Sequence, residues 1–105
     1  MEKLTFTLDA ATPAGGTRQQ AIIGVVASGN LEVLLERGAS PAICTVEIAT
    51  AAHGFGAVWE AVLNDFAARR AAGGLRIAIN DGGARPDTVA LRLAQGVRLI
   101  EEDEA

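Results

Sequence analysis

Side chains capable of chemistry are few in this sequence, and they lie far apart. The chain holds one cysteine, Cys44, and one histidine, His53. A Cys–His nucleophilic pair needs a third group that orients the histidine, and no residue spacing here supplies one. Histidine, cysteine and carboxylate residues also fail to cluster at the spacing of metal ligands. The sequence therefore predicts neither catalytic residues nor a metal site.

One hydroxyl lies where a partner enzyme could reach it. Ser28, Gly29 and Asn30 separate two apolar runs, and the pattern predicts a hairpin with Ser28 at its tip. Gly29 and Asn30 would then present the tip, because glycine adds no bulk and asparagine tolerates a left-handed backbone. Such residues are also common in turns without any function. A serine without a neighbouring base suits a modification site better than a catalytic nucleophile.

The side-chain pattern also predicts the register of this hairpin. A three-residue loop pairs Ala27 with Leu31, Val25 with Val33, and Ile23 with Leu35, so one face is entirely apolar. A two-residue loop would instead place glutamates on that face. Since a slip of one residue moves every side chain to the other face, we expect the three-residue loop.

The elements that would position this hairpin follow from hydrophobic periodicity. Alternating or continuous apolar runs predict five strands, at residues 4–8, 21–27, 31–36, 43–50 and 75–79. A spacing of three and four residues predicts a helix over 55–70, ended by Gly73-Gly74, and another that begins at Pro86. The second helix is less distinct, since Val89, Leu91 and Leu93 also alternate as in a strand. Trp59 falls in the apolar stripe of the first helix and is expected in the core, as is Cys44 in its strand. His53 is expected to cap that helix or to lie on the surface.

These elements predict an α+β fold in a single domain over residues 1–105. Consecutive strands joined by tight turns indicate a largely antiparallel sheet of four to five strands, with two helices packed on one face.

Composition narrows the function further. Half of the residues are apolar and 21% are charged, as in ordinary soluble domains. A net charge of −4 is opposite to what binding of nucleic-acid phosphates needs, and no apolar run approaches the roughly 20 residues of a membrane span. A single cysteine fits a reducing cytoplasm. We therefore expect a cytoplasmic protein that binds neither nucleic acid nor membrane.

Two segments carry a resemblance to a known family. The run from Gly24 to Glu36 reads GVVASGNLEVLLE, and residues 81–86 read DGGARP, followed by VALRL at 89–93. Both closely resemble the acyl carrier (delta) subunit of malonate decarboxylase, and chain length and element order agree. The Ser-Gly hairpin is also similar, more distantly, to the carrier subunit of citrate lyase. In the family pattern Gly often precedes the serine and Asp follows the glycine, where this chain has Ala27 and Asn30. Both departures leave the acceptor hydroxyl in place and bear on recognition by the attaching enzyme.

The resemblance implies a non-catalytic carrier rather than an enzyme. It implies that Ser28 is covalently attached to 2'-(5''-phosphoribosyl)-3'-dephospho-CoA, which makes the chain a phosphoprotein whose terminal thiol carries acetyl and malonyl thioesters. The implied partners are the transferase and decarboxylase subunits of the complex, a malonyl transacylase and the transferase that attaches the prosthetic group.

Two other functions remain open from the sequence. One is the equivalent carrier of a citrate-lyase-type complex. The other is an unmodified structural or regulatory subunit that only binds partners.

Overall fold

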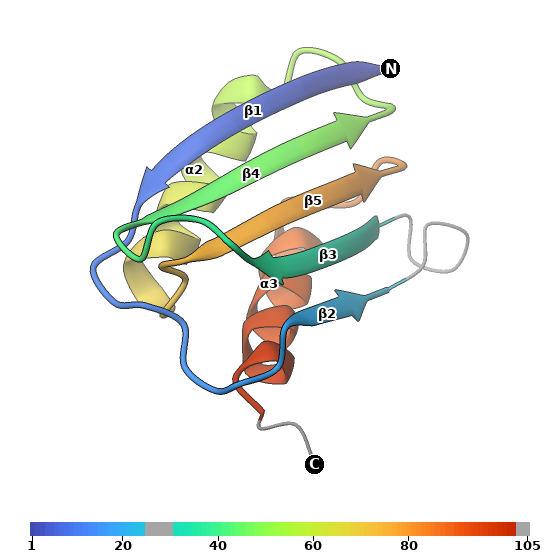
Figure 1. Cartoon of the computed structure of the whole chain (residues 1–105). Helices are drawn as coiled ribbons and strands as arrows, with labels where there is room; N and C mark the ends of the chain where they lie inside the picture. The colour runs from blue at the N-terminus through green and yellow to red at the C-terminus, as the bar shows by residue number, and fades with distance from the viewer. Residues whose placement is uncertain (25–30, 103–105) are drawn as a thin grey trace.

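The computed structural model describes residues 1–24 and 31–102, and within them it forms one sheet and two helices. In chain order the elements are β1 (Glu2–Asp9), β2 (Gln20–Ile23), β3 (Leu31–Arg37), β4 (Ile43–Thr50), α2 (Gly56–Arg69), β5 (Leu75–Asp81) and α3 (Pro86–Ile100). Both helices cover the same face of the five-stranded sheet (Figure 1). The predicted α+β fold is thereby confirmed.

The strand order differs from a simple run of hairpins. It is β1-β4-β5-β3-β2, so β5 lies between β3 and β4, which are consecutive in the sequence. Three neighbouring pairs are antiparallel, while β4 and β5 are parallel and are connected through α2. Parallel neighbours need a long crossover, and a helix commonly provides it. The sheet is therefore largely antiparallel, as expected, although β2 and β3 are the one antiparallel pair formed by consecutive strands.

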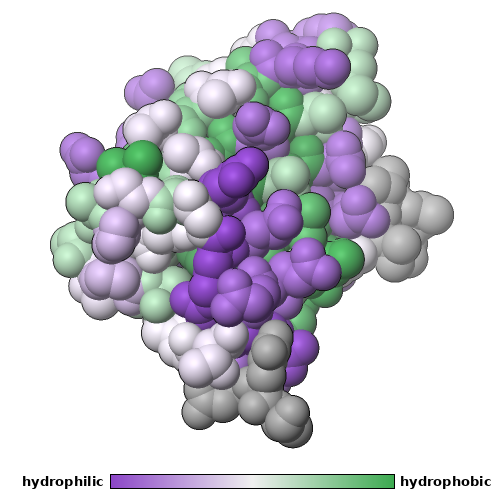
Figure 2. Space-filling model, in the orientation of Figure 1, coloured by the Kyte–Doolittle hydropathy of each residue, from purple (hydrophilic) through white to green (hydrophobic). Residues whose placement is uncertain are grey.

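The core lies between the sheet and the helices. The alternation predicted for β4 is confirmed, because Cys44 and Val46 are fully buried and Ile48 is nearly so. The inward residues of β3 and β5 are buried in the same layer: Leu31, Val33, Leu35, Leu75, Ile77 and Ile79. Figure 2 shows the opposite, helix-free face, where hydrophilic side chains cover the middle of the sheet. Burial on one face of each strand thus sets the orientation of the whole sheet.

The two helices follow the predicted periodicity. In α3, Pro86 stands in the first turn, and Val89, Leu93, Val97 and Ile100 are buried, so the helical interpretation of this segment is confirmed. In α2, Trp59 is 6% exposed and belongs to the core. The helix ends at Arg69 and Arg70 is already extended, so the predicted stop at Gly73-Gly74 lies a few residues too late.

The strand before Ser28 is where the prediction fails. The apolar run was expected to form a buried strand over 21–27, but β2 is a four-residue strand at the edge of the sheet, with Ile22 57% exposed. Ile23 pairs with Val33 rather than with Leu35. The predicted register is therefore wrong by two residues at Ile23, whereas the predicted loop over 28–30 lies outside the described residues. An even shift keeps every side chain on its predicted face, so Glu32 and Glu36 still lie on the outer face.

Gly24 gives the physical reason for the shifted register. Its φ of +78° lies in the left-handed region, which turns the chain away from the ladder directly after Ile23. A β-carbon at this position would also overlap the backbone carbonyl of Leu31. Only glycine allows the two segments to approach so closely. β2 therefore ends directly before Gly24 and β3 begins at Leu31, while residues 25–30 between them lie outside the described residues.

We expect Gly24→Ala to lower the free energy of unfolding by about 2 kcal/mol or more. The left-handed backbone alone costs an alanine about 1–2 kcal/mol, and the overlap with the Leu31 carbonyl adds to that cost. Gly54→Ala is the matched control, because Gly54 has a similar φ of +84° but nothing within 4 Å of its β-carbon position. Urea denaturation measures both variants. Equal losses in the two would contradict a role for the close approach.

Candidate functional site

The predicted attachment segment lies outside the described residues. Ser28, Gly29 and Asn30 belong to residues 25–30, as do Ala27 and Val25 of the predicted hairpin pairs. Its two flanks are described: Gly24 closes β2 and Leu31 opens β3. These flanks fix the end of the sheet at which the segment is anchored.

Covalent geometry limits how far Ser28 can lie from the described fold. Three residues span at most about 11 Å, so the Ser28 α-carbon lies within that distance of the Leu31 α-carbon. Leu31 pairs directly with Asp81, the last residue of β5. The segment is thus anchored at the end of the sheet where β5 and β4 finish and α3 begins (Figure 1).

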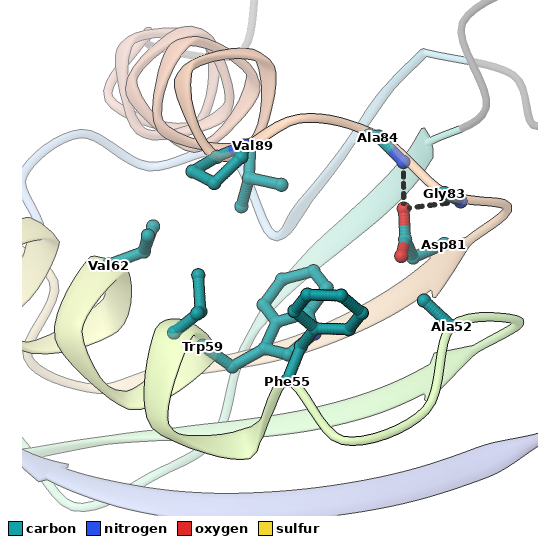
Figure 3. Close-up of a pocket in the computed structure, with 10 residues that line it drawn as sticks. Ala52, Phe55, Trp59, Val62, Asp81, Gly83, Ala84 and Val89 are labelled. Carbon is teal, nitrogen blue, oxygen red and sulfur yellow. Dashed lines mark hydrogen bonds between the residues drawn. The ribbon is translucent and has the colours of Figure 1, made fainter.

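An apolar pocket opens at the same end of the molecule. It has a volume of about 240 Å³ and lies between the start of α2, the start of α3 and the turn after β5. Trp59 and Phe55 line it from the start of α2, and Val89 lines it from α3 (Figure 3). Asp81 and Ala52 lie at the sheet end of the pocket. We call this cavity the Trp59 pocket.

Asp81 holds together the two loops that border the Trp59 pocket. Its Oδ1 accepts hydrogen bonds from the backbone N–H groups of Gly83, at 3.1 Å, and Ala84, at 2.7 Å. Its Oδ2 accepts one from the Thr50 hydroxyl at 2.8 Å, and the Thr50 oxygen in turn accepts from the Ala52 N–H at 3.1 Å. Asp81 and Thr50 are both buried, so the bond between their side chains is shielded from competing water, and the bonds to the three backbone N–H groups are partly shielded. One carboxylate therefore fixes the turn after β5 relative to the loop after β4.

Sequence reasoning missed the Trp59 pocket, although a signal for it exists. Phe55, Val58 and Trp59 were assigned together to the apolar stripe of the first helix. Trp59 alone of these is buried, whereas Phe55 is 51% and Val58 42% exposed. The surplus of apolar residues at the start of α2, more than the buried face can cover, was the available sign. Asp81 was interpreted only as the end of a strand, because a side-chain cap of this kind resembles any turn aspartate.

Cys44 and His53 do not form a pair. Cys44 lies buried near the start of β4, while His53 is exposed beyond the far end of the same strand. The six residue-to-residue steps from Cys44 to Thr50 extend about 20 Å. His53 does not cap α2 either, since Phe55 occupies the N-cap position and gives no side-chain hydrogen bond. Of its two predicted roles, the surface position is the one observed.

Cys44 gives a pH-dependent prediction about stability. Burial raises the pKa of the Cys44 thiol from 9.0 to about 11. The thiol stays protonated to a higher pH in the folded chain than in the unfolded chain. Its contribution to the free energy of unfolding is therefore fully present below pH 9 and is lost as the pH rises toward 11. Between pH 8 and pH 10.5 we expect the unfolding free energy to fall by about 2 kcal/mol more in the wild type than in Cys44→Ala. Urea denaturation at the two pH values measures this, and parallel pH profiles would contradict it.

Metal sites and membrane-spanning helices can be judged for residues 1–24 and 31–102. No group of three or more histidine, cysteine or carboxylate side chains there is arranged to hold a metal ion. None of the helices in this part of the chain has the length and apolar character to cross a membrane.

Comparison with known proteins shows which family this chain resembles. The family model for the malonate decarboxylase delta subunit (MdcD) matches residues 18–100, a region that includes Ser28, Asp81 and Trp59. The malonate decarboxylase acyl carrier protein of Bradyrhizobium diazoefficiens is 58% identical over 103 residues, covering 98% of both chains. That of Xanthomonas euvesicatoria pv. vesicatoria is 49% identical over 105 residues, the full length of both.

A solved structure has the same fold. One chain in the crystal structure of a Pseudomonas malonate decarboxylase hetero-tetramer in complex with malonate superposes with a TM-score of 0.82. It is 37% identical in sequence, and the match covers 95% of this chain and 99% of that one. The likeness therefore extends over the whole described domain rather than over a local motif.

Proposed function

The chain belongs to the malonate decarboxylase delta subunit family, and on this premise we propose that it carries acyl groups on a prosthetic arm attached to Ser28. The observation that carries the proposal is the family match over residues 18–100, which includes the serine segment. The arm is 2'-(5''-phosphoribosyl)-3'-dephospho-CoA, and its thiol bears acetyl and malonyl thioesters. The chain itself is a non-catalytic carrier subunit.

The described residues beside the segment fit such an arm. Arg92 on α3 places its Nε 3.7 Å from the β-carbon position of Gly24, four residues before Ser28. This Nε is buried and has no hydrogen-bond partner among the described residues. A buried donor without an acceptor is costly, and a phosphate oxygen is a strong acceptor for a guanidinium. The Arg92 Nη1 already donates to Gln95 Oε1 at 3.1 Å, so a phosphate-bearing group at Ser28 would meet a guanidinium whose Nε is still without an acceptor in the described part of the chain.

The carrier needs little chemistry of its own. The attaching transferase supplies the base that removes the proton from the serine hydroxyl, so Ser28 needs only to be accessible. Gly29 and Asn30 have the role of presenting it. When bound, the arm supplies a thioester, which stabilises the α-carbanion left by loss of CO2 far better than a free carboxylate would. Partner subunits provide the hydrogen-bond donors for the enolate oxygen.

The partners follow from the sequence of acyl transfers. A transferase subunit, with a malonyl transacylase, exchanges the carried acetyl group for malonyl, so that acetate leaves. The decarboxylase subunits then release CO2, and one proton added at the α-carbon restores the acetyl group. The Pseudomonas relative forms a hetero-tetramer, which supports a place for this chain in a multi-subunit complex. A tether keeps the thiol near each partner at an effective concentration on the order of mM.

The alternatives are less well supported. A carrier of a citrate-lyase-type complex would share the arm, but the family model and the curated relatives are those of malonate decarboxylase. An unmodified structural subunit would not need the serine segment. The cytoplasmic location stays a prediction from the sequence.

The direct test is the intact mass of the protein purified from its native host, with peptide mapping of any added group. We expect an adduct of the mass of the phosphoribosyl-dephospho-CoA arm, located on the peptide that contains Ser28. A complex that decarboxylates malonate while its Ser28 carries no group would contradict the proposal.

A further inference from the structure

The Trp59 pocket lies at the surface edge of the core, since its walls include the buried Trp59 and Val89 as well as exposed apolar side chains. It is open at the surface, and two of its apolar residues, Phe55 and Val58, are 51% and 42% exposed. Its volume of about 240 Å³ is smaller than the about 300–1,000 Å³ of pockets that bind drug-sized molecules. It therefore suits a short, mostly apolar group rather than a nucleotide.

The Trp59 pocket lies within reach of whatever Ser28 carries. The Ser28 α-carbon lies within about 11 Å of the Leu31 α-carbon. Leu31 pairs with Asp81, one of the pocket residues, and directly paired α-carbons lie about 5 Å apart. An arm of phosphoribosyl, nucleotide and pantetheine units is longer than the sum of these two distances. The terminal thioester can therefore fold back to the pocket while Ser28 stays anchored.

The electrostatics of the Trp59 pocket discriminate between neutral and anionic groups. Asp81 is its one ionisable lining residue among those the structure describes, and no lysine, arginine or histidine lines it. Both oxygens of Asp81 already accept hydrogen bonds, from Thr50 and from two backbone N–H groups. A second carboxylate in this pocket would lose its hydration, find no cation and face a like charge. A neutral acetyl group meets none of these penalties.

We propose that the Trp59 pocket shelters the acetyl end of the arm and excludes the malonyl end. This inference rests on the proposed attachment at Ser28. Trp59, Phe55 and Val89 cover the acetyl thioester and keep it from water, so the resting carrier does not lose its acyl group to hydrolysis. Exchange of acetyl for malonyl introduces a carboxylate, which the pocket rejects. The malonyl thioester then extends into solvent, where the decarboxylase subunits can take it.

The test compares the arm-bearing protein in its free-thiol, acetyl and malonyl forms. Trp59 is the only tryptophan in the chain, so its indole N–H gives a single NMR signal. With a ¹³C-labelled acyl group, we expect nuclear Overhauser contacts from the acetyl methyl to the Trp59 and Val89 side chains. The malonyl form should show these contacts at no more than a tenth of that intensity, and its indole signal should match that of the free thiol.

A matched pair of variants links these contacts to the pocket. Ala52→Leu fills the mouth, whereas Ala90→Leu adds the same side chain at an exposed position of α3 outside the pocket. We expect Ala52→Leu to remove the acetyl contacts and to shorten the half-life of the acetyl thioester in neutral buffer at least threefold. Ala90→Leu should change neither. Should Ala52→Leu fail to fold by circular dichroism, Phe55→Ser opens the same wall at a half-exposed position and should have the same effects.

The possible outcomes separate this inference from the carrier function. An arm that is present on Ser28 but makes no acetyl contact with Trp59 overturns the pocket proposal and leaves the carrier proposal intact. Equal contacts from acetyl and malonyl overturn the charge selection. A third outcome is that the wild type shows no acetyl contact and Ala52→Leu assembles less well with the other subunits. The pocket would then bind a side chain of a partner subunit, and the acetyl proposal would be overturned. Absence of the arm from active protein overturns both proposals.

Discussion

Ser28→Ala is expected to abolish both the attachment of the arm and malonate-dependent CO2 release by the reconstituted complex. The substitution removes the oxygen to which the phosphoribosyl group is joined, and alanine has no atom that can replace it. Without the tethered thiol no thioester forms, so malonate-dependent turnover should fall to the background of the assay. Intact mass and a radiometric assay of ¹⁴CO2 release measure the two effects.

The chain offers a close control for this prediction. Ser28 and Ser40 are its only serines, and Ser40 lies exposed in the turn between β3 and β4. Ser40→Ala should leave both the adduct and the release of CO2 unchanged. Ser40→Ala should unfold within about 0.5 kcal/mol of the wild type, as surface substitutions usually do, and we expect Ser28→Ala to fold normally. Turnover by Ser28→Ala close to that of Ser40→Ala would rule out the carrier function.

We expect Asp81→Ala to lower the free energy of unfolding by about 3 kcal/mol, a large loss for a single polar substitution. The change leaves three hydrogen-bond donors without their acceptor: the Thr50 hydroxyl and the N–H groups of Gly83 and Ala84. The buried Thr50 hydroxyl costs about 1–3 kcal/mol when it loses its partner, whereas the partly buried Gly83 and Ala84 N–H groups recover part of their loss through water. Thermal and urea unfolding measure the loss.

Two variants show whether the hydrogen bonds of Asp81 are the cause. Asp81→Asn keeps an acceptor oxygen for Gly83 and Ala84, so it should cost about 1 kcal/mol. Asp65→Ala removes a carboxylate whose ion pair with Arg69 is exposed, and it should cost no more than about 0.5 kcal/mol. The near-ultraviolet circular dichroism of Trp59 should change in Asp81→Ala alone, because the pocket loops loosen. A loss below 1 kcal/mol in Asp81→Ala would contradict the role of this network.

The parts of the fold that could be predicted are those encoded by local periodicity. The buried faces of β3 and β4 and the apolar stripe of α3 follow from residues two, three or four positions apart. The shift at Gly24 did not disturb them, because a displacement of two residues preserves the face of every side chain. The family was also readable without coordinates, since family resemblance depends on residue identity and order.

The sequence by itself thus determined the kinds of element, their faces and the family. Tertiary structure alone decided that β5 lies between β3 and β4. Whether β4 pairs with β3 in a hairpin or with β5 through the α2 crossover depends on the packing of the whole sheet, which no local sequence pattern expresses. It also decided the register at Gly24, where a left-handed glycine and the Leu31 carbonyl meet across the turn. The Trp59 pocket is likewise decided by tertiary structure alone. Its walls come from α2, α3 and the loops that Asp81 ties together, and residues so distant in sequence become neighbours only when the chain packs.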